Sequence, residues 1–282
     1  MPGTLFVVAT PIGNLEDVTA RALRVLRESA VIAAEDTRRT AHLLARYGIT
    51  TPSTSLHEHN EDRKAPSLIA RLERGDNVAL VSDAGTPTIS DPGQRFIQKA
   101  IQAGIRVESV PGPNAAIAAL AVSGFPSDSF CFLGFPPTRS TARAAWFQRA
   151  RDAGGTVVFF EAPHRIIETL KQLEQAVGDR DVVVCRELTK THENLVRGPI
   201  SEVLSAVFPL KGEFTVVLDV GRITEDMPAN SLSGSQAMAE LGDMTKGERI
   251  SRRAAIGRIA RRHNVPPNEV YAAIERAKKS GQ

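Results

Sequence analysis

The sequence predicts two α/β domains followed by a small, all-helical C-terminal domain. Apolar, β-rich runs alternate with helical patterns as far as Gly221, and a polar stretch then leads into patterns that are helical only. The length of 282 residues also suits two domains of ordinary size. The predicted boundaries are 1–115 and 116–222 for the α/β domains, 223–233 for a linker and 234–282 for the basic helical domain.

The first domain reads as strands separated by helices. The predicted strands are 4–10, 30–36, 51–56, 77–84 and 106–112, and the predicted helices are 18–29, 37–48, 61–75 and 91–104. Pro92 stands at the start of a helix, and Gly48, Gly75 and Gly104 stand at helix ends, as is typical of these residues. This alternation predicts a mostly parallel sheet with helices on both faces.

The second domain repeats the alternation after a connection, 111–128, that contains a helix. Its predicted strands are 129–135, 156–162, 181–188, 193–199 and 212–221, and its predicted helices are 141–154, 164–178 and 200–208. In the C-terminal domain we predict helices 235–242, 246–263 and 267–279, with a helix–turn–helix joint between the last two. Thr245 and Glu248 form a capping-box pattern at the start of the middle helix.

Charge is concentrated at the C-terminal end of the chain. Residues 1–222 hold 25 basic and 25 acidic side chains, whereas residues 245–282 hold 10 basic and 3 acidic ones. A helix 246–263 would carry most of these cations, and such a cluster suits a phosphate-rich partner or a solvated surface equally well.

The first residues lack the basic start of a signal peptide, and no apolar run approaches the roughly 18–20 residues that cross a bilayer. A cytoplasmic protein without a membrane anchor is therefore expected.

Four loops are candidates for a ligand site. In an open parallel sheet, ligands bind beyond the carboxyl ends of the strands. The segments at those ends are ATPIGNL, EDTRRT, SDAGTPTISDPG and VPGPNAA, which are rich in small and turn-forming residues. None matches a Walker A loop or the GxGxxG dinucleotide fingerprint, which argues against an ordinary NAD enzyme. Asn114 is a candidate helix N-cap in the last of them.

The second domain adds polar residues at strand ends, among them Glu161, His164, Arg165, Glu187 and Lys190. Each alone is an ordinary solvated residue, but together they could supply a general base and phosphate-binding cations. A metal site is not expected: His57 and His59 lack acidic or cysteine partners at ligand spacing. Cys131 and Cys185 lie in apolar runs and are interpreted as small buried side chains, which suits a reducing compartment.

Seven strings of the sequence together resemble a known family. VATPIGNLEDVT, AAEDTRRT, LVSDAGTPTISDPG, VPGPNA, FFEAPHR, RELTKTHE and GEFTVVL occur in order between residues 4 and 221. They resemble the ribosomal small-subunit methyltransferase I family, the 16S rRNA cytidine 2′-O-methyltransferases of the tetrapyrrole methylase superfamily. ATPIG stands where corrin and porphyrin enzymes of the superfamily usually carry a GxGPG-like loop.

The resemblance implies a cofactor, a reaction and an assembly. It implies S-adenosylmethionine in a cleft between the two α/β domains, a homodimer, and methyl transfer to a cytidine ribose in the decoding region of 16S rRNA, free or in the 30S subunit. By loop matching, the cofactor would be contacted by Pro11, Ile12, Asp83, Ala84, Gly85, Thr86, Pro87, Ile89, Asn114 and Ala115.

The acceptor hydroxyl needs a base, and the RNA needs cations. A ribose hydroxyl is a weak nucleophile, so a carboxylate within hydrogen-bond reach is desirable, and the candidates are Glu35, Asp36 and Glu161. The candidates for RNA phosphates are Arg38, Arg39, Arg165, Lys190, Arg252 and Arg253. Two other functions stay open: a tetrapyrrole or protein methyltransferase of the same superfamily, and a ligand-sensing regulator that binds nucleic acid through its C-terminal helices.

Overall fold

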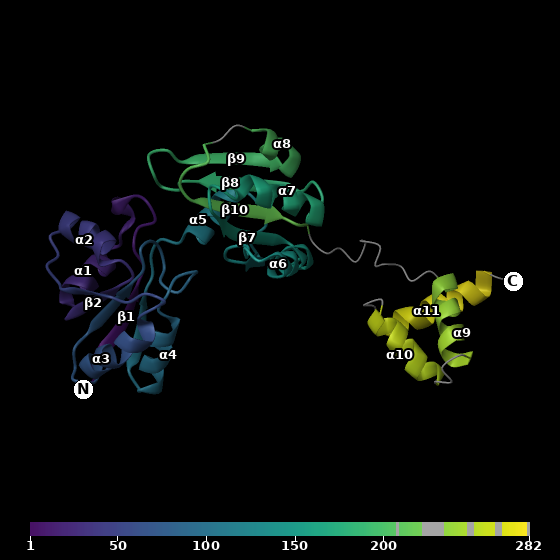
Figure 1. Ribbon diagram of the computed structural model, residues 1–282, viewed down its shortest axis with the longest axis horizontal. Helices are drawn as coiled ribbons and strands as arrows, with labels where there is room; N and C mark the ends of the chain where they lie inside the picture. Colours follow the sequence, from purple (N-terminus) through teal and green to yellow (C-terminus); the bar gives the residue numbers. More distant parts are fainter. Residues whose placement is uncertain (207–208, 222–233, 247–250, 263–266, 281–282) are drawn as a thin grey trace. The chain divides into compact units, whose positions relative to one another are not determined.

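The computed structural model describes residues 1–206, 209–221, 234–246, 251–262 and 267–280 (Figure 1). The chain divides into two compact units, Met1–Gly221, called the α/β unit below, and Arg222–Gln282, called the helical unit. The predicted class of two α/β sheets followed by helices is confirmed. The predicted linker 223–233 lies outside the described residues, and the predicted boundary between 115 and 116 stays a prediction.

The first sheet of the α/β unit is wholly parallel, as expected from the alternation. Its strands lie in the order β3-β2-β4-β1-β5. They are β1 (Thr4–Val8), β2 (Val31–Ala34), β3 (Ser53–Ser55), β4 (Val78–Val81) and β5 (Arg106–Val110). The helical segments are η1 (Leu15–Asp17), α1 (Ala20–Glu28), α2 (Thr37–Arg46), α3 (Glu61–Glu73) and α4 (Gln94–Gln102).

Two apolar layers hold helices on both faces of this sheet. Leu26 of α1 and Leu44 of α2 pack on one face, and Leu72 of α3 and Phe96 of α4 pack on the other. All four residues of β2 and of β4 are buried, because each central strand is covered on both sides. Because helices cover both faces of the sheet, a ligand can reach it at the ends of the strands.

The second sheet is mixed. Its order is β6-β7-β10-β8-β9, and only the β6–β7 pair is parallel. The strands are β6 (Phe130–Phe132), β7 (Thr156–Glu161), β8 (Asp181–Arg186), β9 (Asn194–Pro199) and β10 (Phe214–Asp219). The helices are α5 (Ala115–Ser123), α6 (Ser140–Asp152), α7 (Ile166–Val177) and α8 (Ile200–Ser205). Helix α5 packs on one face, and α6, α7 and α8 cover the other.

The helical unit contains α9 (Gly234–Lys246), α10 (Arg252–Arg262) and α11 (Pro267–Ser280), which share a small apolar core around Ile259 and Ile274. The prediction of one helix over 246–263 was wrong in its start, because Lys246 ends α9. Thr245 does not begin a helix either: its hydroxyl donates to the carbonyl of Leu241 at 2.6 Å, a bond typical of threonine inside a helix. Among the described residues, no helix is long and apolar enough to span a membrane.

Candidate functional site

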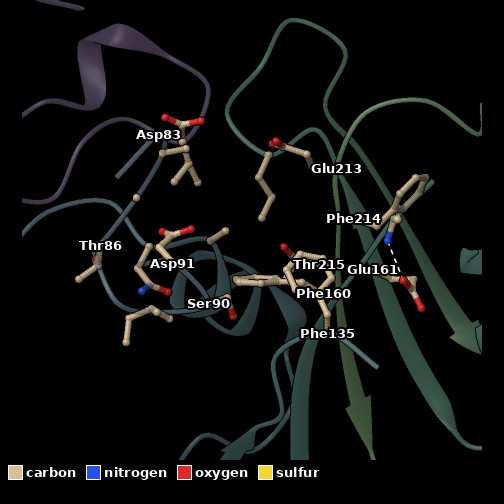
Figure 2. A pocket seen from close by; sticks show the side chains of 18 of the residues that line it. Asp83, Thr86, Ser90, Asp91, Phe135, Phe160, Glu161, Glu213, Phe214 and Thr215 are labelled. Carbon is tan, nitrogen blue, oxygen red and sulfur yellow. Dashed lines mark hydrogen bonds between the residues drawn. The ribbon is translucent and has the colours of Figure 1, made fainter. Parts of the chain in front are cut away.

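A cavity of about 420 Å³ lies where the four predicted loops meet the second sheet (Figure 2). The loops converge because the parallel strands β1, β2, β4 and β5 all end at one edge. From these loops the lining includes Ile12, Glu35, Arg39, Asp83, Ala84, Gly85, Thr86, Ile89, Ser90, Asp91, Asn114 and Ala115. From the second sheet it includes Phe135, Phe160, Glu161, Ala162, Pro163, Leu188, Gly212, Glu213, Phe214 and Thr215.

Hydrogen bonds connect the loops that follow β1, β4 and β5 to one another. Thr10 and Gly85 exchange two backbone hydrogen bonds, of 2.9 and 3.0 Å. The Thr86 hydroxyl donates to the carbonyl of Pro113 at 3.1 Å. Asn114 caps α5 as predicted, accepting from the amides of Ala116 and Ile117. These bonds connect the loops of the cavity wall in the absence of a ligand.

Gly85 lies close to Ile12 of the neighbouring loop, so a side chain at position 85 should destabilise the fold. Its φ is +78°, and an added Cβ would lie 3.3 Å from Ile12 Cγ2. We expect Gly85→Ala to lower the free energy of unfolding by about 1–2 kcal/mol, measured by urea titration. Gly104→Ala is the matched control, since Gly104 has a φ of +70° and open space around it. An equal or smaller loss for Gly85→Ala would contradict the crowding at Ile12.

The loops that follow β2 and β4 bring the carboxylates of Glu35, Asp36 and Asp83 close together. The amide of Asp36 donates to Asp83 Oδ1 at 2.9 Å, and the amide of Asp83 donates to Glu35 Oε2 at 3.3 Å. Burial raises the pKa of Glu35, and the charge of Asp83 adds to the rise. Arg39, whose Nη1 lies 3.5 Å from Asp83 Oδ2, partly offsets this negative charge.

Asp91 is the most perturbed acid in the cavity. Burial, with added repulsion from Glu35 and Asp83, raises the pKa of Asp91 to about 6, although a hydrogen bond with Ser82 opposes the rise. Figure 2 shows its carboxylate pointing into the space between the loops of the first sheet and the residues of the second sheet. A carboxyl group of this kind can exchange a proton near neutral pH.

Asp36, a candidate base, caps a helix and binds an arginine. Its carboxylate caps α2 by accepting from the amide of Arg38, and it also binds the Arg38 side chain at 2.7 Å. The Arg38 side-chain hydrogen bond is the main reason that the pKa of Asp36 falls to about 2. Asp36 does not line the cavity, and so weak a base there is poorly suited to take a proton.

Glu161, another candidate base, borders the cavity but points away from it (Figure 2). Phe160 faces the cavity, so the next residue of β7 faces the layer of α6 and α7. There the buried carboxylate accepts from the Thr169 hydroxyl and the Ala162 amide, and it lies 3.4 Å from Arg165 Nε. This arrangement favours a role in holding the fold.

The predicted cations of the α/β unit are mostly engaged. Arg38 is bound to Asp36, and Arg165 donates to the carbonyls of Pro136 and Pro137. Lys190 Nζ lies 2.9 Å from Glu187 Oε1 and 3.1 Å from Glu213 Oε2. Burial alone would lower the pKa of Lys190, but these two bonds outweigh burial and raise it. Of the four cations, only Arg39 lines the cavity.

In the helical unit, Arg252 is also paired. Its Nη2 lies 3.6 Å from Glu275 Oε1, and its guanidinium stands 5.4 Å from the centre of the Tyr271 ring. The side chain of Arg253 lies outside the described residues. A role for either residue in RNA binding stays a prediction.

The assignment of the cofactor residues also stays a prediction, but most of them surround the cavity. Pro11 and Pro87 do not line it and are buried beneath their loops. Sequence reasoning missed Asp91, Ser90 and the aromatic residues Phe135 and Phe160. Asp91 and Ser90 stand in the same string as Asp83, and Phe160 stands in FFEAPHR, but neither string shows which of its side chains face the cavity. Within the described residues, no group of three His, Cys, Asp or Glu side chains could hold a metal ion.

The chain matches the family model "Tetrapyrrole (Corrin/Porphyrin) Methylases" over residues 4–204. A protein of Escherichia coli O157:H7, "Ribosomal RNA small subunit methyltransferase I", is 45% identical over 82% of each chain. Proteins of the same name are 47% identical in Halalkalibacterium halodurans, over 77% of this chain and 76% of the relative, and 40% identical in Haemophilus influenzae, over 96% of each.

Solved structures share the fold at low identity. Uroporphyrin-III-C-methyltransferase from Thermus thermophilus superposes with a TM-score of 0.53 at 21% identity, covering 77% of this chain and 95% of that one. A diphthine synthase superposes with a TM-score of 0.60 at 16% identity, covering 76% and 89%. These likenesses concern the fold alone, because enzymes on one fold differ widely in substrate.

Proposed function

The chain belongs to the ribosomal RNA small subunit methyltransferase I family of tetrapyrrole methylases, and on that premise we propose that it methylates 16S rRNA. The proposed reaction moves a methyl group from S-adenosylmethionine to the ribose 2′-hydroxyl of a cytidine in the decoding region. The observation that carries the proposal is the 40% identity to the Haemophilus influenzae relative over 96% of each chain. The proposed location is the cytoplasm, and the proposed assembly is a homodimer.

The residues of the cavity suit S-adenosylmethionine. A volume of about 420 Å³ is in the range of small-molecule sites. The carboxylates of Glu35, Asp83 and Asp91 would favour a ligand that carries a sulfonium and an ammonium cation. Phe135 and Phe160, whose ring centres lie 5.5 Å apart, offer apolar surface for a purine. When bound, S-adenosylmethionine would supply a methyl group from a sulfonium, and the loss of that methyl group leaves a neutral thioether.

The protein must align the acceptor and remove its proton. We assign the general base to Asp91, whose raised pKa gives it more affinity for the hydroxyl proton than an ordinary aspartate has. The Asp91 carboxylate would accept the proton of the 2′-hydroxyl. Glu35 supports this step through its negative charge, which helps to raise the pKa of Asp91. The hydrogen-bonded loops of the cavity wall would keep the reacting groups in line.

Methyl mapping tests the proposed function. Purified protein, radiolabelled S-adenosylmethionine and either naked 16S rRNA or 30S subunits should give label at one ribose of a decoding-region cytidine, located by mass spectrometry of nuclease fragments. A labelled base in place of a ribose would correct the acceptor atom. Label in a protein or a tetrapyrrole but not in RNA would overturn the proposal, and so would binding of both ligands without methyl transfer, as a regulator would show.

A further inference from the structure

A second hollow of the α/β unit, of about 820 Å³, lies between α6 and α7, and we refer to it as the α6–α7 groove. Arg143 and Arg151 line it from α6, and Gln172 and Gln175 line it from α7. His164 and Arg165 stand at the end where α7 begins. No part of the proposed chemistry uses this groove.

The α6–α7 groove is lined by several basic side chains. Three arginines and a histidine line it against one carboxylate, that of Glu168, in this described part of the chain. Arg165 is paired with Glu161 beneath the floor, and Arg151 Nε lies 3.4 Å from Asp152 Oδ1 at the end of α6. Arg143 has no ion pair within 4.0 Å among the described residues, so its charge is the one in the groove without a carboxylate partner. Such a surface attracts anions.

Arg143 is held in place rather than left mobile. Its Nε donates to Gln172 Oε1 and its Nη2 to Thr169 Oγ1, both at 2.6 Å, and its Nη1 donates to the carbonyl of Pro137 at 3.2 Å. Its guanidinium stacks over the Phe147 ring, 5.3 Å from the ring centre. Burial and the nearby charge of Arg165 lower the pKa of Arg143. Two neighbouring fixed cations of this kind would be relieved by an anion.

The groove begins where the cavity ends. Because β6 and β7 are parallel, the loops that follow them leave the same edge of the sheet. On the first loop, Phe135 lines the cavity and Thr138 lines the groove. On the second, Pro163 lines the cavity and His164 lines the groove. A strand bound along the groove would therefore arrive at the cavity.

We propose that the α6–α7 groove binds the phosphates of the RNA strand next to the acceptor nucleotide. The inference rests on the proposed function, because it takes the acceptor to be RNA. Arg143 and Arg151 are eight residues apart on α6, about 12 Å along the helix, and can contact different phosphates of one strand. The amide of Gln175 suits ribose hydroxyls and phosphate oxygens, whereas the amide of Gln172 holds Arg143 and Glu168 in place. The contacts would therefore position the strand without reading its bases.

Arg151→Glu tests the groove, and Arg149→Glu is the matched control. Both residues are exposed on α6 and both changes reverse one charge, but Arg149 lies about 200° around the helix and does not line the groove. The probes are a fluorescent fragment of 16S rRNA for the dissociation constant, and 30S subunits for KM and kcat. Arg151→Gln, a milder change, guards against misfolding, and melting curves show that each variant is folded.

We expect Arg151→Glu to raise the RNA dissociation constant and KM roughly tenfold, as loss of one charge-assisted contact does, with kcat unchanged. The slope of log affinity against log salt should fall by about 1. Arg149→Glu should change the dissociation constant less than twofold. If Arg151→Glu and Arg149→Glu have equal effects, or if neither has an effect, the proposal that the α6–α7 groove binds RNA is wrong.

The two proposals fail differently. If the wild-type protein binds the fragment and transfers no methyl group, the proposed function fails, and the dissociation constants still decide the groove. If it methylates RNA while Arg151→Glu and Arg149→Glu behave alike, only the groove fails. If it binds no 16S rRNA, in a fragment or in 30S subunits, both fail.

Discussion

Asp91→Asn should lower the rate constant for methyl transfer by about 10²–10⁴-fold while cofactor affinity stays within a few-fold of wild type. Asparagine keeps the shape of the side chain but cannot accept the proton of the acceptor hydroxyl. Single-turnover transfer to 30S subunits measures the chemical step, and calorimetric titration with S-adenosylmethionine measures binding. A variant that binds cofactor and transfers methyl groups at the wild-type rate would remove Asp91 from the mechanism.

The pH dependence gives an independent test of the same residue. The carboxylate must be ionised to act as a base, and its pKa is about 6, so the wild-type rate should fall as pH drops through 6 and level off above about 7. Glu35→Gln removes a negative charge that raises the pKa of Asp91, so the fall should move to lower pH. If Glu35→Gln abolishes transfer and Asp91→Asn does not, the two roles are exchanged.

As pH rises, the contribution of Asp91 to stability should fall while the rate of methyl transfer rises. The folded pKa of Asp91 is raised above the ordinary value, so the native state loses stability as pH rises from about 4 through 6 and the group ionises. Asp91→Asn removes this cost, and its melting temperature at pH 8 should equal or exceed that of wild type. A folded, stable and inactive protein is the outcome that separates a catalytic loss from a structural one.

The sequence was sufficient for the architecture and the location of the site. Alternating strands and helices predicted the parallel sheet, and the parallel direction alone brings the loops after β1, β2, β4 and β5 to one edge. The turn-forming residues of those loops marked the edge as a binding site. The architecture and the place of the cavity could be predicted because they depend on chain direction and residue class, which a sequence displays directly. A binding role for the cavity stays a prediction.

The orientations of individual acids could not be predicted in the same way. β7 is apolar along almost its whole length because both faces of the sheet are covered, so the sequence did not show which of Phe160 and Glu161 faces the cavity. Asp36 could have been a helix cap or a base, and only the hydrogen bonds of Arg38 decide for the cap. The raised pKa of Asp91 depends first on burial and then on the charge of Glu35, which comes from another part of the chain, and neither is visible in the sequence.

Glu161→Ala should destabilise the α/β unit more than Gly85→Ala does, because it removes the buried partner of several groups. The carboxylate is fully buried, accepts from Thr169 and Ala162, and neutralises Arg165. Removing one member of a buried ion pair costs about 3–5 kcal/mol, which should lower the melting temperature by roughly 6–20 °C. Glu168→Gln, on the exposed side of α7, is the control and should change it little.

Glu161→Gln separates this structural role from a catalytic one. Glutamine fills the same space and can still accept from the Thr169 hydroxyl, so we expect a smaller loss of stability and a methyl-transfer rate within about threefold of wild type below the melting temperature. Arg143 also binds Thr169, so the loss of the carboxylate should loosen the floor of the α6–α7 groove and raise KM for 30S subunits before it lowers kcat. A folded Glu161→Gln variant that binds cofactor but transfers no methyl groups would restore Glu161 as the base, and Asp91→Asn would then be expected to remain active.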